Sequence, residues 1–388
     1  MVKKHRENAP ISARKFMEEL RRYEKGSVSR RHFLGVTGLG TAMAVLGSAM
    51  PGLVPGRAHA ADDLGDKLVF STWPNYFNPA NIEAFTKATG VHVQVNIFGS
   101  NEEMLAKLQA GGTGWDVFVP TNYTISNYVA LDLIQKLDLA RLPNFDQKTQ
   151  DPLFADPATV NGQVYAVPKN WGTTGFVVNT KKIKGDPKSH KDFFKVTMGE
   201  GSGHTIVHDY QLTTIGAALC ALGHSFNSID KKELADAEKL LIKSKPHLFA
   251  ITSDYQPGMR NGDAWMSICW TGDGAQLHKD LPEMSYVVAN DGGEIWSDFY
   301  CIPKEAPHMK AAYAFINYLM EPAVQAKEFE SHGYATSDSR VSALLPASTA
   351  SDPILFPAKE LMNGLEFGAA QTLTDPTRAE VMARFKSA

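Results

Sequence analysis

The chain has 388 residues and a formal net charge of −3, but the charge is unevenly distributed. Residues 1–60 hold 11 lysines and arginines against 4 acidic residues, so residues 61–388 carry 28 basic and 38 acidic side chains, a net charge of −10. This acidic balance argues against nucleic-acid binding and is compatible with a cationic ligand. The hydrophobic share of 43% is typical of a globular protein, and the length suggests two domains or lobes.

The cysteines and histidines give no sign of a metal or a cofactor. Cys220, Cys269 and Cys301 cannot all pair and form no CxxC motif, which argues against a disulfide framework or a zinc site. Cys269 and Cys301 lie in apolar runs and are predicted to be buried. The 12 histidines are scattered without metal-ligand spacing.

Residues 1–60 have the pattern of an export signal. A twin-arginine motif, SRRHFL, occupies residues 29–34, and a weakly apolar run follows at 35–50. Residues 58–60, AHA, form a small-x-small cleavage site, and Arg57 just before it disfavours the ordinary secretory route. These features predict a bacterial twin-arginine (Tat) signal peptide and a periplasmic destination. The alternative, a membrane-anchoring helix, is disfavoured because the apolar run is too short to span a bilayer comfortably.

The first half of the remaining chain alternates between strands and helices. The predicted strands cover 68–73, 91–98 and 115–120, and the predicted helices cover 79–89, 101–110 and a segment opening at 121–123. Such alternation predicts an α/β fold with a mainly parallel sheet. Ligands of these sheets bind outside the carboxyl ends of the strands. Four residues fall there: Trp73, Tyr76, Thr121 and Tyr123.

The second half begins with a crossing segment at 162–168 that leads into new strands, so we place a lobe boundary near Pro168. Two short buried strands are predicted within 266–303, and the second should return to the first lobe near Asp298. Predicted helices cover 213–222, 231–244, 310–320, 323–332 and most of 352–388.

Residues 266–303 contain two pairs of a tryptophan and an aspartate. Trp270 and Asp273 lie three apart across a predicted Thr-Gly turn, and Trp296 and Asp298 lie two apart on one face of a strand. An aromatic ring attracts an ammonium by about 0.5–2 kcal/mol, and a carboxylate accepts a charge-assisted hydrogen bond from it. The pairs therefore suit an organic cation with an alkyl body. The alternative is that both tryptophans are ordinary core and both aspartates are solvated.

Seven short segments occur in the order and near the spacing of one known family: TWPNY (72–76), GWDVFVPTNY (114–123), LIQKLD (133–138), YAVP with WGTTG (165–175), WTGD (270–273), WSD (296–298) and HGYAT (332–336). Over essentially all of residues 62–388 the sequence resembles the spermidine/putrescine-binding periplasmic proteins that feed ABC importers. The resemblance implies the two-lobed periplasmic-binding-protein fold, with crossing hinge strands that let the lobes close on ligand. We predict that 62–168 with 298–343 form lobe 1, and that 169–297 with 344–388 form lobe 2.

The resemblance also implies roles for the matching residues. Trp73 and Tyr76 would line the wall of lobe 1, and Thr121 and Tyr123 would supply hydroxyl groups. Two tryptophans would stack along the alkyl chain, two aspartates would hold the ammonium groups and one tyrosine would close a side: Trp270 and Trp296, Asp273 and Asp298, and Tyr334.

Departures from the family pattern point to three possible specificity positions, Lys169, Asp209 and Thr213. Family members often carry a further carboxylate near the start of the helix that here begins around Thr213, with Asp209 nearby. The absence of this further carboxylate from the chain favours a diamine over a long polyamine. Lys169 stands where the family often has an aromatic residue. It is interpreted either as a solvated surface lysine or as a cation that pairs with a ligand carboxylate.

We therefore expect the periplasmic substrate-binding component of an ABC importer, with putrescine or a related polyamine as its preferred ligand. A receptor for a zwitterionic ω-amino acid, with Lys169 holding its carboxylate, is an alternative. A Tat-exported hydrolase is disfavoured, because no Gly-x-Ser-x-Gly or His-Glu-x-x-His motif is present. The expected partners are the amine ligand, an inner-membrane permease and the Tat machinery, with no nucleic acid and no cofactor.

Overall fold

The computed structural model describes residues 64–388, so the predicted signal peptide lies outside the described residues. These described residues form one compact unit. Within the described part, no helix has the length and apolar character needed to cross a bilayer.

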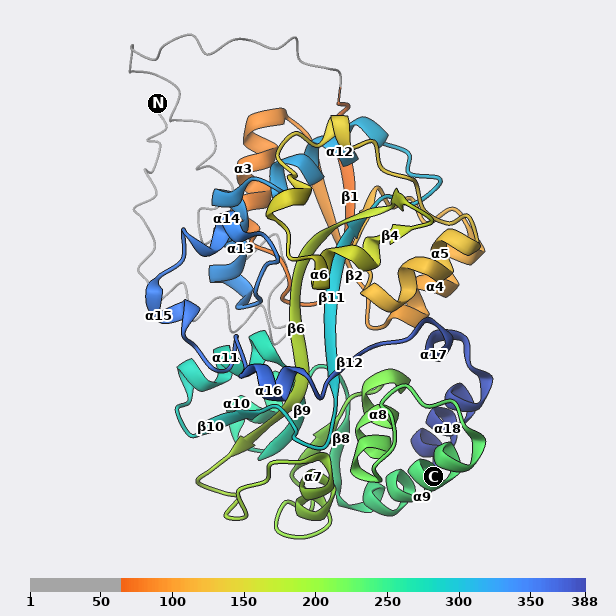
Figure 1. Cartoon of the computed structure of the whole chain (residues 1–388), viewed down its shortest axis with the longest axis vertical. Coiled ribbons are helices and arrows are strands. Elements are labelled where there is room, and N and C mark those ends of the chain that lie inside the picture. Colours follow the sequence, from red (N-terminus) through yellow and green to blue (C-terminus); the bar gives the residue numbers. More distant parts are fainter. Residues whose placement is uncertain (1–63) are drawn as a thin grey trace, which may run out of the picture. The chain divides into compact units, whose positions relative to one another are not determined.

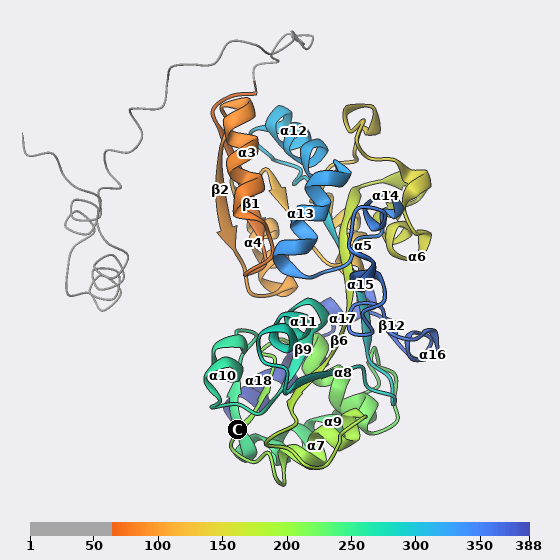
Figure 2. The ribbon, with the colours of Figure 1, turned by 90° about the vertical axis from the view of Figure 1, so that its left-hand side faces the viewer.

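Two long strands run through the whole unit and join its two lobes. β6 (Ala166–Asn179) and β11 (Glu294–Cys301) lie antiparallel, and they cross from the upper to the lower lobe in yellow-green and cyan in Figures 1 and 2. Every residue of both strands is buried. They form the centre of one sheet with the order β2-β1-β3-β11-β6-β9-β7-β8. This architecture confirms the predicted two-lobed α/β fold with crossing strands, and the exact lobe boundaries stay a prediction.

Lobe 1 is built on β1 (Lys67–Thr72), which pairs in parallel with β2 (His92–Ile97) and β3 (Val117–Phe118). Its helices include α3 (Pro79–Thr89), α4 (Asn101–Ala110), α5 (Ile125–Ala130), α12 (Met309–Leu319) and α13 (Pro322–His332). The predicted helix limits at 79–89 and 101–110 are confirmed because they rest on capping chemistry. The Asn78 side chain accepts the Ala80 N–H at the start of α3, and Gly90 ends that helix with φ 78°.

Lobe 2 continues the sheet with three parallel strands, β9 (Met266–Trp270), β7 (Thr205–Val207) and β8 (Leu248–Ile251). β10 (Met284–Val287) pairs with β6. The helices here are α7 (His190–Thr197), α8 (Gln211–Ala221), α9 (Lys231–Ser244), α10 (Gln256–Asn261), α11 (Thr271–Asp280) and α18 (Pro376–Ser387).

Short elements connect these cores: α6 (Pro152–Ala155), β4 (Thr159–Val160), β5 (Gln163–Val164), α14 (Ser339–Ser342), α15 (Ala347–Ala350), α16 (Lys359–Met362), β12 (Glu366–Phe367) and α17 (Ala370–Thr374). β12 pairs in parallel with β11, so the mostly helical tail also adds a strand beside the crossing segment.

The prediction for the residues that follow Trp270 is wrong. The predicted Thr-Gly turn after Trp270 is the first turn of α11, and Asp273 lies within that turn. Gly272 and Gly274 lower helix propensity and so hid the helix from the sequence pattern. The carboxylate of Asp273 near the helix start favours the helix, because the amino-terminal end of a helix carries a partial positive charge.

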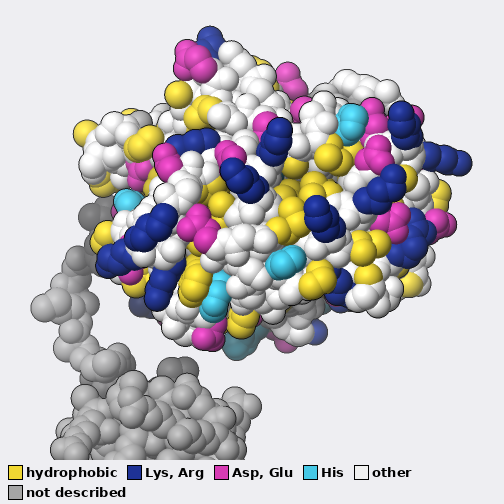
Figure 3. Space-filling model, turned by 90° about the horizontal axis from the view of Figure 1, so that it is seen from below, with side chains coloured by type: hydrophobic (Ala, Val, Ile, Leu, Met, Phe, Trp, Pro, Cys, Tyr) yellow, Lys and Arg dark blue, Asp and Glu magenta, His cyan; other side chains and the backbone are white. Residues whose placement is uncertain are grey.

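The three cysteines are buried and free, as the apolar runs around Cys269 and Cys301 predict. Seen from the end that Figure 1 places at the bottom, basic and acidic side chains are interspersed over the surface (Figure 3). This face therefore carries no broad area of a single sign.

Candidate functional site

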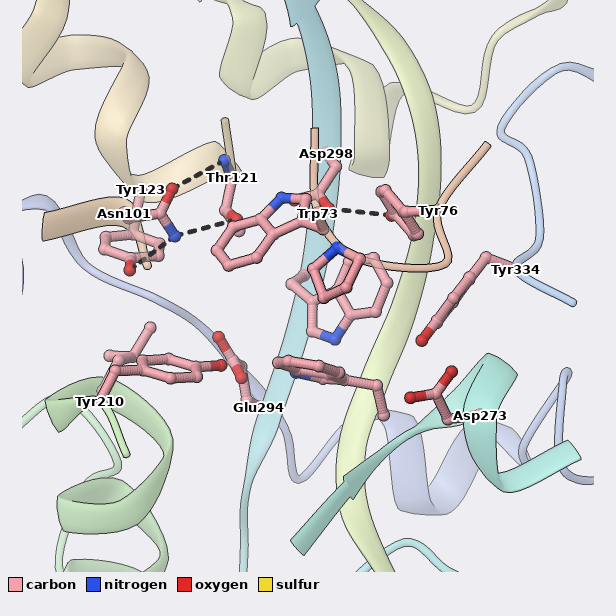
Figure 4. A pocket seen from close by; sticks show the side chains of 14 residues that line it. Trp73, Tyr76, Asn101, Thr121, Tyr123, Tyr210, Asp273, Glu294, Asp298 and Tyr334 are labelled. Carbon is pink, nitrogen blue, oxygen red and sulfur yellow. Dashed lines mark hydrogen bonds between the residues drawn. The ribbon is translucent and has the colours of Figure 1, made fainter. Parts of the chain in front are cut away.

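A cavity of about 490 Å³, including its mouth, lies where the lobes meet beside β11. Fourteen residues line it (Figure 4): Trp73, Pro74, Tyr76, Asn101, Thr121, Tyr123, Tyr210, Leu212, Trp270, Asp273, Glu294, Trp296, Asp298 and Tyr334. All nine predicted ligand-binding residues are among them. The structure thus brings together side chains separated by more than 250 positions in the chain, and their contact with a ligand stays a prediction.

Two tryptophans bring the walls of the two lobes into contact. Trp73 follows β1, and its indole N–H donates to the Val119 carbonyl at 3.0 Å, which fixes the ring. Its ring meets that of Trp270, the last residue of β9, at a centroid distance of 6.4 Å. Trp270 is stacked on Tyr210 at 6.3 Å. The carboxyl ends of strands from both lobes therefore supply one continuous aromatic wall.

A second aromatic group encloses the cavity from the side of β11. The ring of Trp296 lies 5.4 Å from that of Tyr334, which lies 5.0 Å from Tyr76. Gly172 on β6 makes this packing possible, because a Cβ there would lie only 2.7 Å from Trp296 Cζ2. Tyr334 lies next to Asp273 in Figure 4, and its role in enclosing a ligand stays a prediction.

Asp273 is held by a neighbouring tyrosine. The Tyr255 hydroxyl donates to Asp273 Oδ2 at 2.7 Å and accepts the Trp270 backbone N–H at 3.1 Å. Burial raises the pKa of Asp273, and the hydrogen bond from Tyr255 opposes that rise. The tie to Trp270 also fixes the carboxylate relative to the aromatic wall.

Asp298 lies on β11 where the strand enters lobe 1. Its backbone forms an isolated antiparallel β-bridge with that of Thr121. Tyr76 lies with its hydroxyl 2.9 Å from Asp298 Oδ2 and also contacts Asn170. Within residues 64–388, Asp298 Oδ1 is buried without a hydrogen-bond partner. Burial raises the pKa of Asp298 to about 7, although Thr121, Tyr76 and Lys169 favour its charged form.

Glu294 is a third acid of the cavity that the sequence analysis missed. It lies two residues before Trp296 and four before Asp298, so all three project from the same face of β11. The Thr174 hydroxyl donates to Glu294 Oε2 at 2.6 Å. Burial raises the pKa of Glu294 to about 8. The sequence signal was present, because the alternation that pairs Trp296 with Asp298 also includes Glu294.

Asn101, also missed, positions the predicted hydroxyl groups. From the first residue of α4, its amide nitrogen donates to Thr121 Oγ1 at 3.1 Å and to the Tyr123 hydroxyl at 2.9 Å. Asn101 follows β2 closely, so the rule for strand carboxyl ends could have found it. Pro74, Tyr210 and Leu212 complete the set of missed lining residues.

Lys169, Asp209 and Thr213 are not among the residues that line the cavity, and their role as specificity positions stays a prediction. The interpretation of Lys169 as a solvated surface lysine is wrong, because the residue is 5% exposed. In the register between β11 and β6, Asp298 lies opposite Asn170 and the next residue, Phe299, lies opposite Pro168. Lys169 is therefore the extra residue of a β-bulge.

The bulge directs Lys169 into lobe 1, away from the cavity. Its ammonium lies 3.8 Å from Glu328 Oε2 and 4.3 Å from the centre of the Tyr76 ring. Burial lowers the pKa of Lys169 to about 8, and Glu328 and Asp298 oppose that shift.

The other two positions also have partners outside the cavity. Asp209 accepts a hydrogen bond from the Ser253 hydroxyl and borders a separate surface groove. The hydroxyl of Thr213 forms a hydrogen bond with His208 at 3.1 Å.

All the charged side chains that line the cavity are acidic. Among the described residues, its lining contains three carboxyl groups and no lysine, arginine or histidine. In residues 64–388, no group of three or more metal-ligating side chains is arranged to hold a metal ion. Such a site favours a guest that brings positive charge and apolar surface.

Comparisons with known proteins agree with this geometry. The sequence model of the family described as bacterial extracellular solute-binding protein matches residues 80–358. The chain is 30% identical over 337 residues to the putrescine-binding periplasmic protein SpuD of Pseudomonas aeruginosa, covering 83% of this chain and 91% of that protein. It is 32% identical over 323 residues to the spermidine/putrescine-binding periplasmic protein of Escherichia coli, covering 81% and 91%.

Solved structures show the same architecture. The spermidine/putrescine ABC transporter substrate-binding protein PotD of Streptococcus pneumoniae superposes with a TM-score of 0.67 at 29% identity, covering 83% of this chain and 99% of that one. The relatives are solute-binding proteins rather than enzymes. The chain therefore belongs to the family of bacterial extracellular solute-binding proteins.

Proposed function

We propose that this protein is the periplasmic receptor of an ABC importer and that it binds a linear polyamine, such as putrescine or spermidine, between its lobes. The observation that carries the proposal is the lining of the cavity, in which Asp273, Asp298 and Glu294 are enclosed by aromatic rings and no basic side chain is among the described lining residues. The relatives named for putrescine or spermidine binding support the same ligand class.

The energetics of such a ligand are reasonable. Micromolar binding needs about −8 kcal/mol. A buried ammonium is tolerated only where a carboxylate compensates its lost hydration. Asp273 and Asp298 lie on opposite sides of the aromatic rings of the cavity, so each can meet one ammonium. Each methylene that is removed from water against the rings adds about 0.8 kcal/mol.

A zwitterionic ligand is less well supported. That alternative needs a cation for the ligand carboxylate, and Lys169, which was its candidate, contacts Glu328 outside the cavity.

Calorimetry on D273N and D298N tests the proposal. Each substitution keeps the shape of the side chain but removes its charge, so affinity for putrescine and spermidine should fall by about a hundredfold. D209N is the matched control, because Asp209 lies on lobe 2 outside the cavity and should bind like the unaltered protein. Unchanged affinity in both D273N and D298N would contradict the proposal.

We further propose that the protein reaches the periplasm through the Tat route and delivers its ligand to an inner-membrane permease. The SRRHFL motif at residues 29–34 supports this route. Replacing both Arg30 and Arg31 by lysine should abolish export, as measured by the amount of protein in a periplasmic extract. Normal export of that variant would exclude the Tat route.

A further inference from the structure

Glu294 is a buried acid whose charge no other residue balances at close range. Its side chain is 3% exposed, and within residues 64–388 it forms no salt bridge. Arg378 favours the charged form of Glu294, but its influence on the pKa is smaller than those of burial, Thr174 and Asp298. A carboxylate in such a place is costly unless a cation or a proton neutralises it.

Glu294 and the two aspartates border different parts of the cavity. Figure 4 shows Glu294 on the side of Tyr210, Asp273 on the opposite side below Tyr334, and Asp298 above the aromatic rings. Three acids that border different parts of one aromatic-lined cavity can each meet a separate positive charge of an extended guest.

The alternative is a purely structural role. Glu294 on β11 pairs in register with Thr174 on β6, and the hydrogen bond between their side chains ties the crossing strands together. That bond uses one of about four acceptor positions on a carboxylate, so it leaves capacity for a ligand. A neutral glutamine would serve the structural role equally well, because its amide oxygen also accepts a hydrogen bond.

We propose that Glu294 is a third cation-recognition position and that it selects an extended amine with three protonated nitrogens over a diamine. This inference rests on the proposed function and specifies how many positive charges the preferred ligand carries. It reverses the expectation from the sequence, in which two acids favoured a diamine.

The test compares E294Q with the unaltered protein by titration calorimetry, using spermidine as the triamine and putrescine as the diamine. The unaltered protein should bind spermidine at least about tenfold more tightly than putrescine, since one charge-assisted hydrogen bond contributes a factor of that order. E294Q should lose about tenfold or more in spermidine affinity while its putrescine affinity changes by less than about threefold.

E102Q is the matched control. Glu102 is also a largely buried glutamate with a raised pKa caused by burial, and it influences Tyr123 and Tyr210, but it borders the surface groove outside the cavity. If recognition depends on direct contact, E102Q keeps the preference for spermidine. An equal loss of preference in E102Q and E294Q would overturn the assignment to Glu294.

A second measurement needs no substitution. Binding of spermidine and of putrescine to the unaltered protein is measured in two buffers of different ionisation enthalpy, which gives the number of protons released. More protons should leave with spermidine, because a third ammonium displaces the proton of Glu294. Equal release, or an unchanged affinity ratio in folded E294Q, overturns this inference alone, whereas failure of both amines to bind the unaltered protein overturns the proposed function.

Discussion

At the scale of single residues, two carboxyl groups of the cavity are weaker acids than exposed carboxyl groups. Burial raises the pKa of Asp298 to about 7 and that of Glu294 to about 8. A cationic ligand stabilises the charged form of each, so binding expels protons and becomes more favourable as pH rises toward these values. The amines themselves stay protonated over this range, because an alkyl ammonium has a pKa of about 10.

We therefore predict that polyamine affinity increases between pH 6 and pH 8, by up to about tenfold per pH unit for each group that must ionise. Calorimetric titrations at several pH values measure this slope. D298N and E294Q should each show a shallower slope than the unaltered protein. An affinity that is constant from pH 6 to pH 8 would contradict the assignment of these acids to ligand charges.

A glycine next to the ring of Trp296 makes a second prediction at this scale. In G172A the new Cβ would lie 2.7 Å from Trp296 Cζ2, and the indole must move because β6 and β11 fix the backbone. Overpacking of this kind costs about 1–3 kcal/mol. We expect this cost to weaken polyamine binding by about tenfold, as measured by calorimetric titration. G364A is the control, because its Cβ would meet only an ordinary contact at 3.5 Å. Equal affinities in the two variants would show that Trp296 does not need its present position.

The residues that could be predicted from the sequence are those whose position follows from a local rule. Trp73 and Thr121 follow strands of a parallel sheet, and Trp296 and Asp298 alternate on one face. Lys169 could not be predicted, because its direction depends on a bulge in the pairing of two strands far apart in the chain. A register shift leaves no trace in the local hydrophobic pattern.

At the scale of elements, the same distinction separates confirmed from missed segments. The helix at 231–244 was predictable because its apolar periodicity and its capping residue agree, with Asp230 accepting the N–H groups of Lys232 and Glu233. α11 was missed because two glycines open it. β6 was divided in the prediction because Pro168 and Gly172 interrupt it, yet it is one strand whose pairing with β11 overrides those local signals.

The bulged segment of β6 carries a testable ion pair. Lys169 and Glu328 are both buried, and Glu328 also accepts hydrogen bonds from Asn81 and from the Asn78 backbone. Removing one partner of a buried pair leaves an uncompensated charge, so K169M should lower the free energy of unfolding by about 3 kcal/mol in a urea titration.

The control for this prediction is K107M. Lys107 pairs with Glu103 at 2.6 Å on an exposed helix face, where such a pair contributes about 0.3–0.5 kcal/mol. If K169M proved as stable as K107M, the buried cluster would not be holding the crossing strand to α13.

At the scale of the whole molecule, the described arrangement of the lobes is a closed one. Trp73 at the end of β1 and Trp270 at the end of β9 are in ring contact, and the carboxyl group of Asp298 is shielded from water. Most residues that line the cavity are buried, among them Tyr76 and Tyr334, each 4% exposed. Asp298 and Glu294 are 5% and 3% exposed, so a solute reaches these two acids only if the lobes separate.

The crossing strands are the parts that can permit this separation. β6 and β11 are the central links between the two halves of the sheet, and the bulge at Lys169 interrupts their pairing beside Asp298. A few residues at such a point can absorb the change of backbone angles in a hinge motion. Ligand binding would then favour closure because the acids and rings of both lobes meet only in the closed arrangement.

We therefore predict that polyamine reduces the radius of gyration of the exported protein in solution scattering, toward the value of about 20 Å expected for a compact chain of this length. D298N at the same ligand concentration should remain as expanded as the ligand-free protein, because it lacks the charge that makes closure favourable. W270A should bind weakly and close less, since it removes the aromatic contact between Trp73 and lobe 2. A radius that is the same with and without ligand would mean that the lobes do not close on it, and that the solute enters a cavity already formed.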